Sequence, residues 1–237
     1  MRSLIIIPAY NEEKSIVNTV NYIMEVHPEM DYLIVNDGST DNTEKICKEN
    51  GFQFITLPIN QGIGGAVQSG YRYALQNDYD IAIQMDGDGQ HDPKYLDQMI
   101  APIVENKANA VIGSRFITKE GFQSSGSRRF GISILSSLIF ICTGKRIKDV
   151  TSGYRAVDRT LIKIYTDNYS RDYPEPEAIV TALVHGMKIQ EVPVIMRERM
   201  AGVSSINLKK AVYYMVKVSL AVVIGRISLG FRKGNKK

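Results

Sequence analysis

Short apolar runs alternate with helical segments along the first half of the chain, and this alternation limits the possible folds most strongly. Each run has the composition of a short buried strand and leads into a polar loop and then a helical stretch. Consecutive strand–helix units predict an α/β fold, with a mostly parallel sheet and helices on both faces. The predicted strands are Leu4–Ile7, Tyr32–Val35, Phe52–Leu57, Ile81–Met85 and Ala110–Gly113.

The fourth predicted strand ends in Asp86-Gly87-Asp88-Gly89-Gln90-His91. Two carboxylates one residue apart, with an amide oxygen nearby, are hard ligands that suit Mg²⁺ or Mn²⁺. Ligands bind at the carboxyl ends of strands in an open α/β sheet. The pattern therefore predicts a metal site at Asp86, Asp88 and Gln90. A polar turn before a helix start at Asp92-Pro93 is the simpler alternative, and the sequence leaves open whether His91 is a ligand or a bystander.

Polar residues also follow the first three strands. Asn11 is placed to cap the next helix, and Asp41 with Glu44 forms an acidic variant of the capping box. Capping leaves Asp37 unexplained, and a carboxylate at a strand end can accept hydrogen bonds from a base or a ribose. The glycine-rich segment 60–66 does not match the dinucleotide-binding fingerprint and indicates close packing beside a ligand.

The pattern is looser after Arg115. A Gly- and Ser-rich loop over 118–127 precedes Arg128 and Arg129, which begin an apolar helix reaching about Cys142. Two arginines at a helix start oppose the helix dipole, and such a conflict is expected at a functional site. An anionic ligand would relieve it, and arginine suits phosphate. A surface pair touching a carboxylate is the alternative. The sequence then predicts a turn and short strand at 149–155, a helix at 178–185 and a last strand at 192–196.

Charge is distributed unevenly along the chain. Residues 197–237 contain ten Lys or Arg and one acid, whereas the rest contains 19 basic and 24 acidic residues. A basic end on an acidic body indicates an anionic partner, either nucleic acid or an anionic membrane surface.

From Asn207 the apolar residues have helical spacing, but Arg226 interrupts them, so an interfacial amphipathic helix fits better than a membrane span. Packing on the domain core is the alternative. We expect one domain at 1–206 and a basic helix and tail at 207–237.

The location follows from cysteine usage and from the first residues. Two cysteines at this spacing give neither a disulfide framework nor a zinc site, so we expect a reducing cytoplasm. Only five apolar residues follow Met1-Arg2-Ser3 before the first polar loop, which does not match a signal peptide.

Taken together, these stretches resemble family 2 glycosyltransferases of the GT-A (Rossmann-like) fold, and most resemble the polyprenyl-phosphate sugar synthases of the dolichol-phosphate mannose synthase group. The resemblance covers about Leu4 to Asn207. The motifs that carry it are Pro8-Ala9-Tyr10-Asn11-Glu12, Asn36-Asp37-Gly38-Ser39-Thr40-Asp41, Asn60-Gln61-Gly62-Ile63-Gly64, Asp86-Gly87-Asp88-Gly89-Gln90-His91, Gly113-Ser114-Arg115 and Ser152-Gly153-Tyr154-Arg155.

The resemblance implies a role for each of these groups. The residues implied in binding the nucleotide sugar are Pro8, Ala9, Tyr10, Glu12, Asp37, Asn60, Gly64, Asp86, Gly87 and Arg199, the last on a loop that closes over the donor. Asp86, Asp88 and Gln90 would bind the metal that neutralises the diphosphate. Arg115, Arg129 and Ser133 match positions that bind an acceptor phosphate. Asp88, Arg115 and Arg129 would be the catalytic residues.

The resemblance implies an inverting, metal-dependent transfer from a UDP- or GDP-sugar to undecaprenyl or dolichyl phosphate, in the assembly of cell-surface glycan or polysaccharide. The implied partner is then an anionic membrane surface rather than nucleic acid, and the expected location is the inner face of the cell membrane. Some relatives rely on a small integral membrane partner, and a homo-oligomer stays open. A family 2 enzyme acting on a glycan hydroxyl, with Glu175 or Glu177 as base, is the main alternative.

Overall fold

The computed structural model describes residues 1–118, 120, 126–171, 174–197, 217, 219, 220, 223 and 224, and only the backbone of Ser127 and Arg128. Arg199 and most of the predicted extension at 207–237 lie outside the described residues, as does the proposed domain boundary. The five described residues of that extension are helical. Within the part of the chain that the structure describes, no helix is long and apolar enough to cross a membrane.

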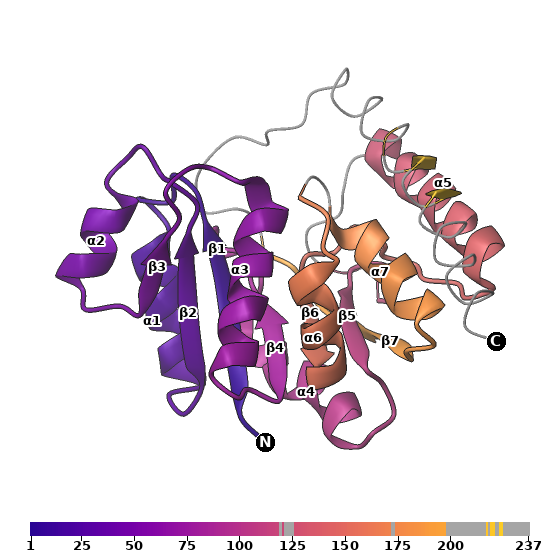
Figure 1. Ribbon diagram of the computed structural model, residues 1–237, viewed down its shortest axis with the longest axis horizontal. Coiled ribbons are helices and arrows are strands. Elements are labelled where there is room, and N and C mark those ends of the chain that lie inside the picture. The colour runs from indigo at the N-terminus through magenta and orange to yellow at the C-terminus, as the bar shows by residue number, and fades with distance from the viewer. Residues whose placement is uncertain are drawn as a thin grey trace.

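A single seven-stranded sheet forms the centre of the protein, with strand order β3-β2-β1-β4-β6-β5-β7 (Figure 1). Every neighbouring pair is parallel except the two pairs that β6 makes with β4 and β5. The mostly parallel sheet predicted from the sequence is therefore confirmed. The strands are β1 (Ser3–Ala9), β2 (Asp31–Asn36), β3 (Phe54–Thr56), β4 (Ile81–Gln84), β5 (Ala110–Ser114), β6 (Arg155–Asp158) and β7 (Ile189–Pro193).

Helices cover both faces of the sheet, as the alternating pattern predicted. On one face pack α3 (Gly62–Gln76), α5 (Gly126–Thr143), α6 (Arg159–Asp167) and α7 (Pro174–Val184). On the other face pack α1 (Ile16–Val26), α2 (Thr43–Glu49) and α4 (Leu96–Val104), with a short 3₁₀ turn, η1 (Pro93–Tyr95), before α4. Figure 1 shows α3, α6 and α7 in front of the sheet.

The side chains of β1 explain why both faces need helices. Leu4 and Ile6 point into the core under α3, while Ile5 and Ile7 point into the core under α1, because successive side chains of a strand alternate between faces. All four are fully buried. Gly70 lets α3 lie close to this strand, since a Cβ atom there would lie 2.3 Å from Cγ2 of Ile6.

Two local expectations are wrong, and both corrections involve distant partners. Asn11 does not cap α1: it has a left-handed backbone (φ 57°), and its Oδ1 accepts the Thr40 backbone N–H at 2.8 Å. Asp41 and Glu44 do not form a capping box, because Asp41 accepts hydrogen bonds from Thr43 and Glu13. Glu44 instead pairs with Lys48 at 2.7 Å.

Of two further predicted boundaries, one is wrong and one is confirmed. The last strand begins at Ile189 rather than at Val192, because residues 189–193 pair with β5. The predicted helix start at Asp92-Pro93 is confirmed, since Asp92 accepts the Lys94 backbone N–H at 3.1 Å and caps η1.

Candidate active site

Those predicted donor-binding residues that the structure describes gather at one edge of the sheet, around the ends of β1, β2 and β4. Pro8 and Ala9 close β1, Asp37 follows β2 directly, and Asp86 lies two residues beyond the end of β4. These strands are parallel neighbours, so their carboxyl ends lie side by side. Loops at such an edge form the ligand-binding crevice of open α/β sheets.

The turn after β4 packs directly against the loop after β1. A Cβ atom at Gly87 would lie 3.3 Å from the Pro8 carbonyl oxygen and 3.6 Å from Cγ of Glu12. The Gly87 carbonyl oxygen also accepts a hydrogen bond from the Thr19 hydroxyl at 3.0 Å. The lack of a side chain at Gly87 therefore brings Asp86 and its neighbours against the Pro8–Glu12 loop.

Asp37 joins the β2 end to the loop that follows β3. Its backbone N–H donates to the Ala9 carbonyl at 2.8 Å, and its Oδ1 accepts the Gln61 backbone N–H at 2.7 Å. The residue is 3% exposed, and its burial raises the pKa of the carboxyl group. A Cβ at Gly38 would lie 2.9 Å from the backbone nitrogen of Asn60. Tyr10, in the loop after β1, is 46% exposed, so its ring is accessible to a ligand.

Asp86 and Asp88 differ in their surroundings. The Asp86 side chain is 34% exposed, and its Oδ1 lies 3.4 Å from the amide nitrogen of Gln84. Asp88 is 2% exposed, and its Oδ1 accepts the Gln90 backbone N–H at 3.0 Å, which closes the turn. Gly89 has a φ of 77°, which favours glycine at this point in the turn.

The oxygen donors in this turn fit a hard divalent cation. No group of three His, Cys, Asp or Glu side chains able to hold a metal occurs among the residues whose positions are described. A metal here would take Asp86 and Asp88, with Gln90 as a third oxygen, and would need further ligands. Mg²⁺ commonly binds through one or two carboxylates together with waters and substrate phosphates, so the donor set agrees with a metal that arrives with a diphosphate.

His91 supports the main chain of Asp86. Its Nδ1 accepts the Asp86 backbone N–H at 3.0 Å, while its Nε2 lies 3.9 Å from Oδ2 of Asp86. The ring stacks on Tyr154, with centroids 4.9 Å apart and planes 14° from parallel. The Tyr154 hydroxyl donates in turn to the Asp92 carbonyl at 3.0 Å. His91 therefore contacts the turn mainly through the backbone, a role that the sequence did not suggest.

The chain returns to this turn at Arg197. The Arg197 backbone N–H donates to the Gln90 carbonyl at 3.0 Å, and the Gln90 amide donates to the Arg197 carbonyl at 3.4 Å. The Arg197 guanidinium pairs with Asp92 at 3.0 Å and lies over the Tyr22 ring, 4.5 Å from its centroid. Two residues further on is Arg199, outside the described part of the chain.

Arg115 lies at the end of β5 in a buried ion pair. Its Nε and Nη2 donate to the two oxygens of Asp149 at 2.8 and 2.7 Å, and its backbone N–H donates to the same carboxylate at 3.0 Å. The Asp149 side chain is fully buried and that of Arg115 is 7% exposed. Sequence reasoning assigned Asp149 no role, because nothing around it in the chain indicates that its partner lies 34 residues earlier.

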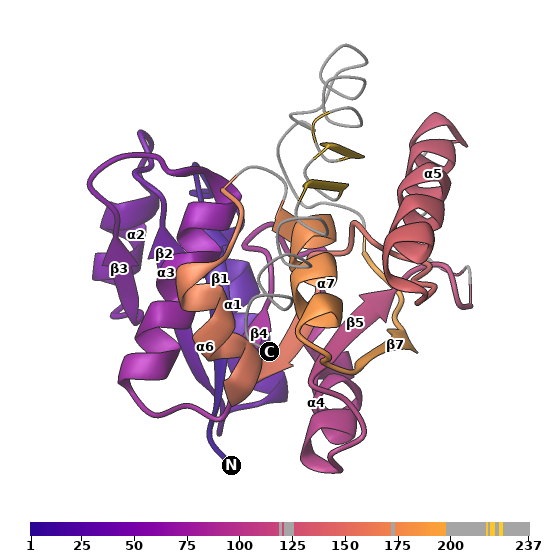
Figure 2. The same ribbon diagram turned by 45° about the vertical axis from the view of Figure 1, so that its right-hand side comes forward.

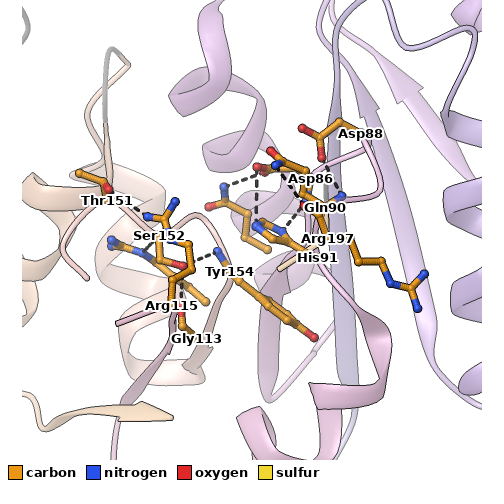
Figure 3. Close-up of polar contacts among 12 residues, drawn as sticks. Asp86, Asp88, Gln90, His91, Gly113, Arg115, Thr151, Ser152, Tyr154 and Arg197 are labelled. Atoms are coloured by element: carbon orange, nitrogen blue, oxygen red, sulfur yellow. Dashed lines mark hydrogen bonds and ion pairs between the residues drawn. The ribbon is translucent and has the colours of Figure 1, made fainter. Parts of the chain in front are cut away.

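The turn that carries Asp149 lies between Arg115 and Asp86. Thr151 accepts a hydrogen bond from Arg115 at 3.1 Å, and the Ser152 hydroxyl donates to the Gly113 carbonyl at 2.7 Å. A Cβ atom at Gly153 would lie 3.3 Å from Oδ2 of Asp86. Figure 3 shows Arg115 with Thr151 and Ser152 on one side of Tyr154 and the Asp86–His91 turn on the other.

Arg129 and Ser133 lie four residues apart in α5, so they share one side of the helix. Both are exposed. Arg115 lies elsewhere, directly after β5. The three predicted acceptor residues therefore belong to two parts of the chain, the residue after β5 and the first two turns of α5. The side chain of Arg128 is outside the described set.

Glu175 and Glu177 lie in the first turn of α7. The Ser170 hydroxyl donates to Oε1 of Glu177 at 2.9 Å, and the Arg155 guanidinium donates to the backbone carbonyl of Glu175 at 2.7 Å. Gly64 approaches the same region: a Cβ there would lie 1.9 Å from the Ser170 carbonyl oxygen. Gly64 is therefore required for backbone packing, whatever it contributes to a ligand.

Comparisons with known proteins agree with this geometry. Residues 4–165 match the family described as Glycosyl transferase family 2. The UDP-N-acetylglucosamine–dolichyl-phosphate N-acetylglucosaminyltransferase of Methanococcus voltae is 34% identical over 210 residues, which are 80% of this chain and 83% of that protein. The undecaprenyl-phosphate mannosyltransferase of Micrococcus luteus is 32% identical, over 87% of this chain and 88% of that protein.

Solved structures share the fold. Glucosyl-3-phosphoglycerate synthase from Mycobacterium tuberculosis in complex with UDP superposes with a TM-score of 0.71 at 16% identity, over 95% of this chain and 80% of that one. The same synthase in complex with Mn²⁺, UDP and glucosyl-3-phosphoglycerate gives a TM-score of 0.66 at 19% identity, over 96% of this chain and 79% of that one. The expected GT-A fold is therefore confirmed.

Proposed function

We propose that this chain, which belongs to glycosyl transferase family 2, transfers a sugar from a nucleoside-diphosphate sugar to the phosphate of a polyprenyl phosphate. Membership in the family makes it a glycosyltransferase. The observation that carries the choice of acceptor is the set of relatives at about a third identity over most of the chain, two of which are named for transfer to dolichyl or undecaprenyl phosphate.

The donor would bind along the carboxyl edge of β3, β2, β1 and β4. Asp37 and Tyr10 are placed to hold the base and ribose, with Asn60 and the Pro8–Glu12 loop beside them. Arg199 would close over the diphosphate. Relatives of the fold bind UDP, and we propose UDP or GDP as the nucleotide here. Asp86, Asp88 and Gln90 would hold Mg²⁺ or Mn²⁺.

The reaction would invert the anomeric carbon. An oxygen of the acceptor phosphate attacks that carbon, the new carbon–oxygen bond forms, and the bond to the nucleoside diphosphate breaks on the opposite side. A divalent metal, when bound, stabilises the charge that develops on the departing diphosphate. A phosphate monoester is already ionised at neutral pH, so the protein needs to position it rather than deprotonate it.

Arg129 and Ser133 would hold the acceptor phosphate from the first turns of α5. Arg115 would contribute from the position directly after β5, where Asp149 fixes the plane of its guanidinium group through two hydrogen bonds. Arginine suits phosphate because its planar group donates several hydrogen bonds in a fixed geometry.

The acceptor is a membrane lipid, so we propose that the enzyme works as a peripheral protein at the inner face of the cell membrane, in glycan or polysaccharide assembly. The basic excess of residues 197–237 would favour an anionic leaflet. A small integral membrane partner and self-association are compatible with this arrangement.

The direct test is transfer by the purified full chain from a panel of UDP- and GDP-sugars, with and without polyprenyl phosphate. We expect product only with the lipid phosphate, loss of product in excess chelator, and loss in Asp88→Asn. Asp167→Asn, at an exposed acid at the end of α6, is the matched control and should keep full activity. Full activity of Asp88→Asn, or of the parent in excess chelator, would contradict metal-dependent transfer.

The runner-up is transfer to a glycan hydroxyl, which would require a general base. Glu175 and Glu177, the two residues that the family resemblance offers as that base, lie in the first turn of α7. With polyprenyl phosphate as acceptor, Glu175→Gln and Glu177→Gln should both keep substantial activity. A loss beyond about 100-fold in either variant, the scale of general base catalysis, would favour the hydroxyl acceptor.

A further inference from the structure

A glutamine occupies a position of β4 where the core would favour an apolar side chain. Figure 2 shows β4 inside the sheet, beside β1 and away from both edges. Successive side chains of a strand alternate between the two faces, so Gln84 shares the face of Ala82, which belongs to the core under α3 and α6. Both residues are 0% exposed. A polar side chain at this depth lowers stability unless its polar atoms are hydrogen-bonded.

The two polar atoms of the Gln84 amide have unequal surroundings. The nitrogen lies 3.4 Å from Oδ1 of Asp86, whereas the oxygen is buried and has no hydrogen-bond partner among the residues that the structure describes. The opposite orientation of the amide would bring its oxygen against the carboxylate, and two acceptors repel each other. The contact with Asp86 therefore sets the orientation of the amide, and it connects Gln84 to a proposed metal ligand.

The surroundings of this pair restrict how the Asp86 carboxylate can turn. A Cβ atom at Gly153 would lie 3.2 Å from Nε2 of Gln84 and 3.3 Å from Oδ2 of Asp86. The main chain of Asp86 is held by His91, whose Nδ1 accepts its N–H at 3.0 Å. The 3.4 Å contact with Gln84 is longer than the usual hydrogen bond, but hydrogen bonds of catalytic sites are often long before the ligands bind. With the backbone held, the Gln84 amide is the group that can fix the carboxylate.

The amide carries no charge, and this suits a neighbour of a metal ligand. Arg155 lies directly opposite Gln84 in the ladder of β4 and β6, but its guanidinium group donates to three backbone carbonyl oxygens, those of Val150, Ser152 and Glu175. A cationic side chain held against Asp86 would compete with a divalent cation for the same negative charge. A neutral amide can orient the carboxylate and leave its charge for the metal.

We propose that Gln84 is a positioning residue for the metal site, which holds the Asp86 carboxylate in the orientation in which it binds the divalent cation. The inference rests on the proposed function, because it takes Asp86 as a metal ligand. Side chains that hydrogen-bond a ligand orient it, and their loss commonly weakens metal binding about 10- to 100-fold. The buried oxygen without a partner is then a local conflict of the kind expected at a functional site.

The test compares Gln84→Met with the parent, both as the full chain. Methionine is an unbranched side chain of similar length that cannot donate a hydrogen bond. Binding of Mn²⁺ in the presence of saturating UDP, measured from the electron paramagnetic resonance of free Mn²⁺, should weaken about 10- to 100-fold. The urea midpoint without metal should equal or exceed that of the parent, because the substitution removes a buried oxygen that has no partner among the described residues.

Gln68→Met is the matched control. The Gln68 amide, in α3, donates to the backbone carbonyls of Tyr165 and Thr166 at 3.3 and 3.0 Å, so it joins α3 to α6 rather than to the turn after β4. We expect a lower urea midpoint for this variant, with Mn²⁺ binding equal to that of the parent. The same substitution at the two glutamines should therefore have opposite effects on stability and on metal binding.

A second variant keeps the proposal testable if Gln84→Met does not fold. Gln84→Asn retains an amide but shortens the side chain, which moves the nitrogen away from Asp86, so Mn²⁺ binding should weaken here as well. Mn²⁺ binding like that of the parent in a folded Gln84 variant would overturn the proposal and leave Gln84 as a core residue. Equal weakening of Mn²⁺ binding in Gln84→Met and Gln68→Met would also overturn it, because a general loss of structure would explain both.

The proposed function fails in a different way. If Gln84→Met binds Mn²⁺ more weakly than the parent but the parent transfers no sugar to any polyprenyl phosphate, the role of Gln84 stands and the acceptor assignment falls. If the parent transfers sugar and Gln84→Met binds Mn²⁺ unchanged, the acceptor assignment stands and the role of Gln84 falls. A parent that binds no Mn²⁺ in the presence of UDP would overturn the role of Gln84 together with the metal site, whether or not sugar is transferred.

Discussion

The buried pair of Arg115 and Asp149 gives the sharpest test of how the second half of the site is held together. Asp149→Asn keeps the shape of the side chain but removes its charge and replaces one acceptor oxygen with a donor. In the native protein that carboxylate accepts three hydrogen bonds from Arg115, two from the guanidinium group and one from the backbone. The substitution would therefore leave a guanidinium group without its counter-charge in a buried position.

The expected loss of stability is large because both side chains are buried. Breaking a buried pair by removing one member costs about 3–5 kcal/mol, out of a total stability of about 5–15 kcal/mol for a typical domain. The exposed pair of Arg159 and Asp78 has the same nitrogen–oxygen distance, 2.7 Å, but its side chains are 43% and 82% exposed. A pair of that kind contributes at most about 1 kcal/mol.

The assay is urea unfolding of the parent, Asp149→Asn and Asp78→Asn at neutral pH. Asn tolerates the left-handed backbone of Asp78 (φ 59°), so this control changes only the charge. We expect a far lower midpoint for Asp149→Asn and nearly no change for Asp78→Asn, with the slope unchanged in both. Losses of equal size in the two variants would refute the argument from burial.

Three other predictions concern Arg129, Asp37 and Cys47. Arg129→Ala should raise the KM for the acceptor or lower kcat with nucleotide affinity nearly unchanged, and an equal loss of nucleotide binding, measured by calorimetry, would assign Arg129 to the donor. Burial raises the pKa of Asp37, so its ionised form destabilises the fold at neutral pH, and this penalty disappears as the pH falls below the ordinary value of about 4. In urea unfolding, Asp37→Asn should accordingly be more stable than the parent at pH 7, and this difference in stability should shrink towards pH 4. Nucleotide binding should weaken in the variant. A stability difference that does not change with pH would contradict this reasoning. Burial also raises the pKa of the Cys47 thiol to about 11, so Cys47 should resist thiol reagents in the native protein and react only on unfolding, and rapid labelling of Cys47 in the folded chain would show that the thiol is accessible.

The sequence predicted those parts of the fold whose signals are local. Each of the first five strands is an apolar run bounded by polar residues, and all five were placed to within a few residues. β6 was placed only approximately, as a short strand in a turn, and its position between β4 and β5 was not predicted. Which strands pair is decided by tertiary packing rather than by the four residues Arg155–Asp158 themselves.

The site shows the same division. The Asp86–Gln90 turn could be predicted as a metal site because its carboxylates are neighbours in the chain and follow a strand, and that assignment stays a prediction. The partner of Arg115 was not, because Asp149 lies 34 residues away and has no periodic or spacing signal. Asn11 was misread for a similar reason: its residue type favours a helix cap, but Thr40 in the next loop provides a better partner for its side chain. The assignment of acceptor residues in α5 remains a prediction drawn from the resemblance.

The contacts between the two halves of the site argue that they act as one unit. Asp86 is held through its backbone by His91, whose ring stacks on Tyr154. Tyr154 follows Gly153, where a Cβ atom would lie only 3.3 Å from Oδ2 of Asp86, and the hydroxyl of the neighbouring Ser152 donates to the Gly113 carbonyl in β5. If these loops were independent, a change near Arg115 would alter acceptor binding alone. Because the 149–154 turn lies against both Arg115 and Asp86, we expect loosening it to displace the proposed metal ligand as well. The proposed donor and acceptor sites would then depend on the same few residues.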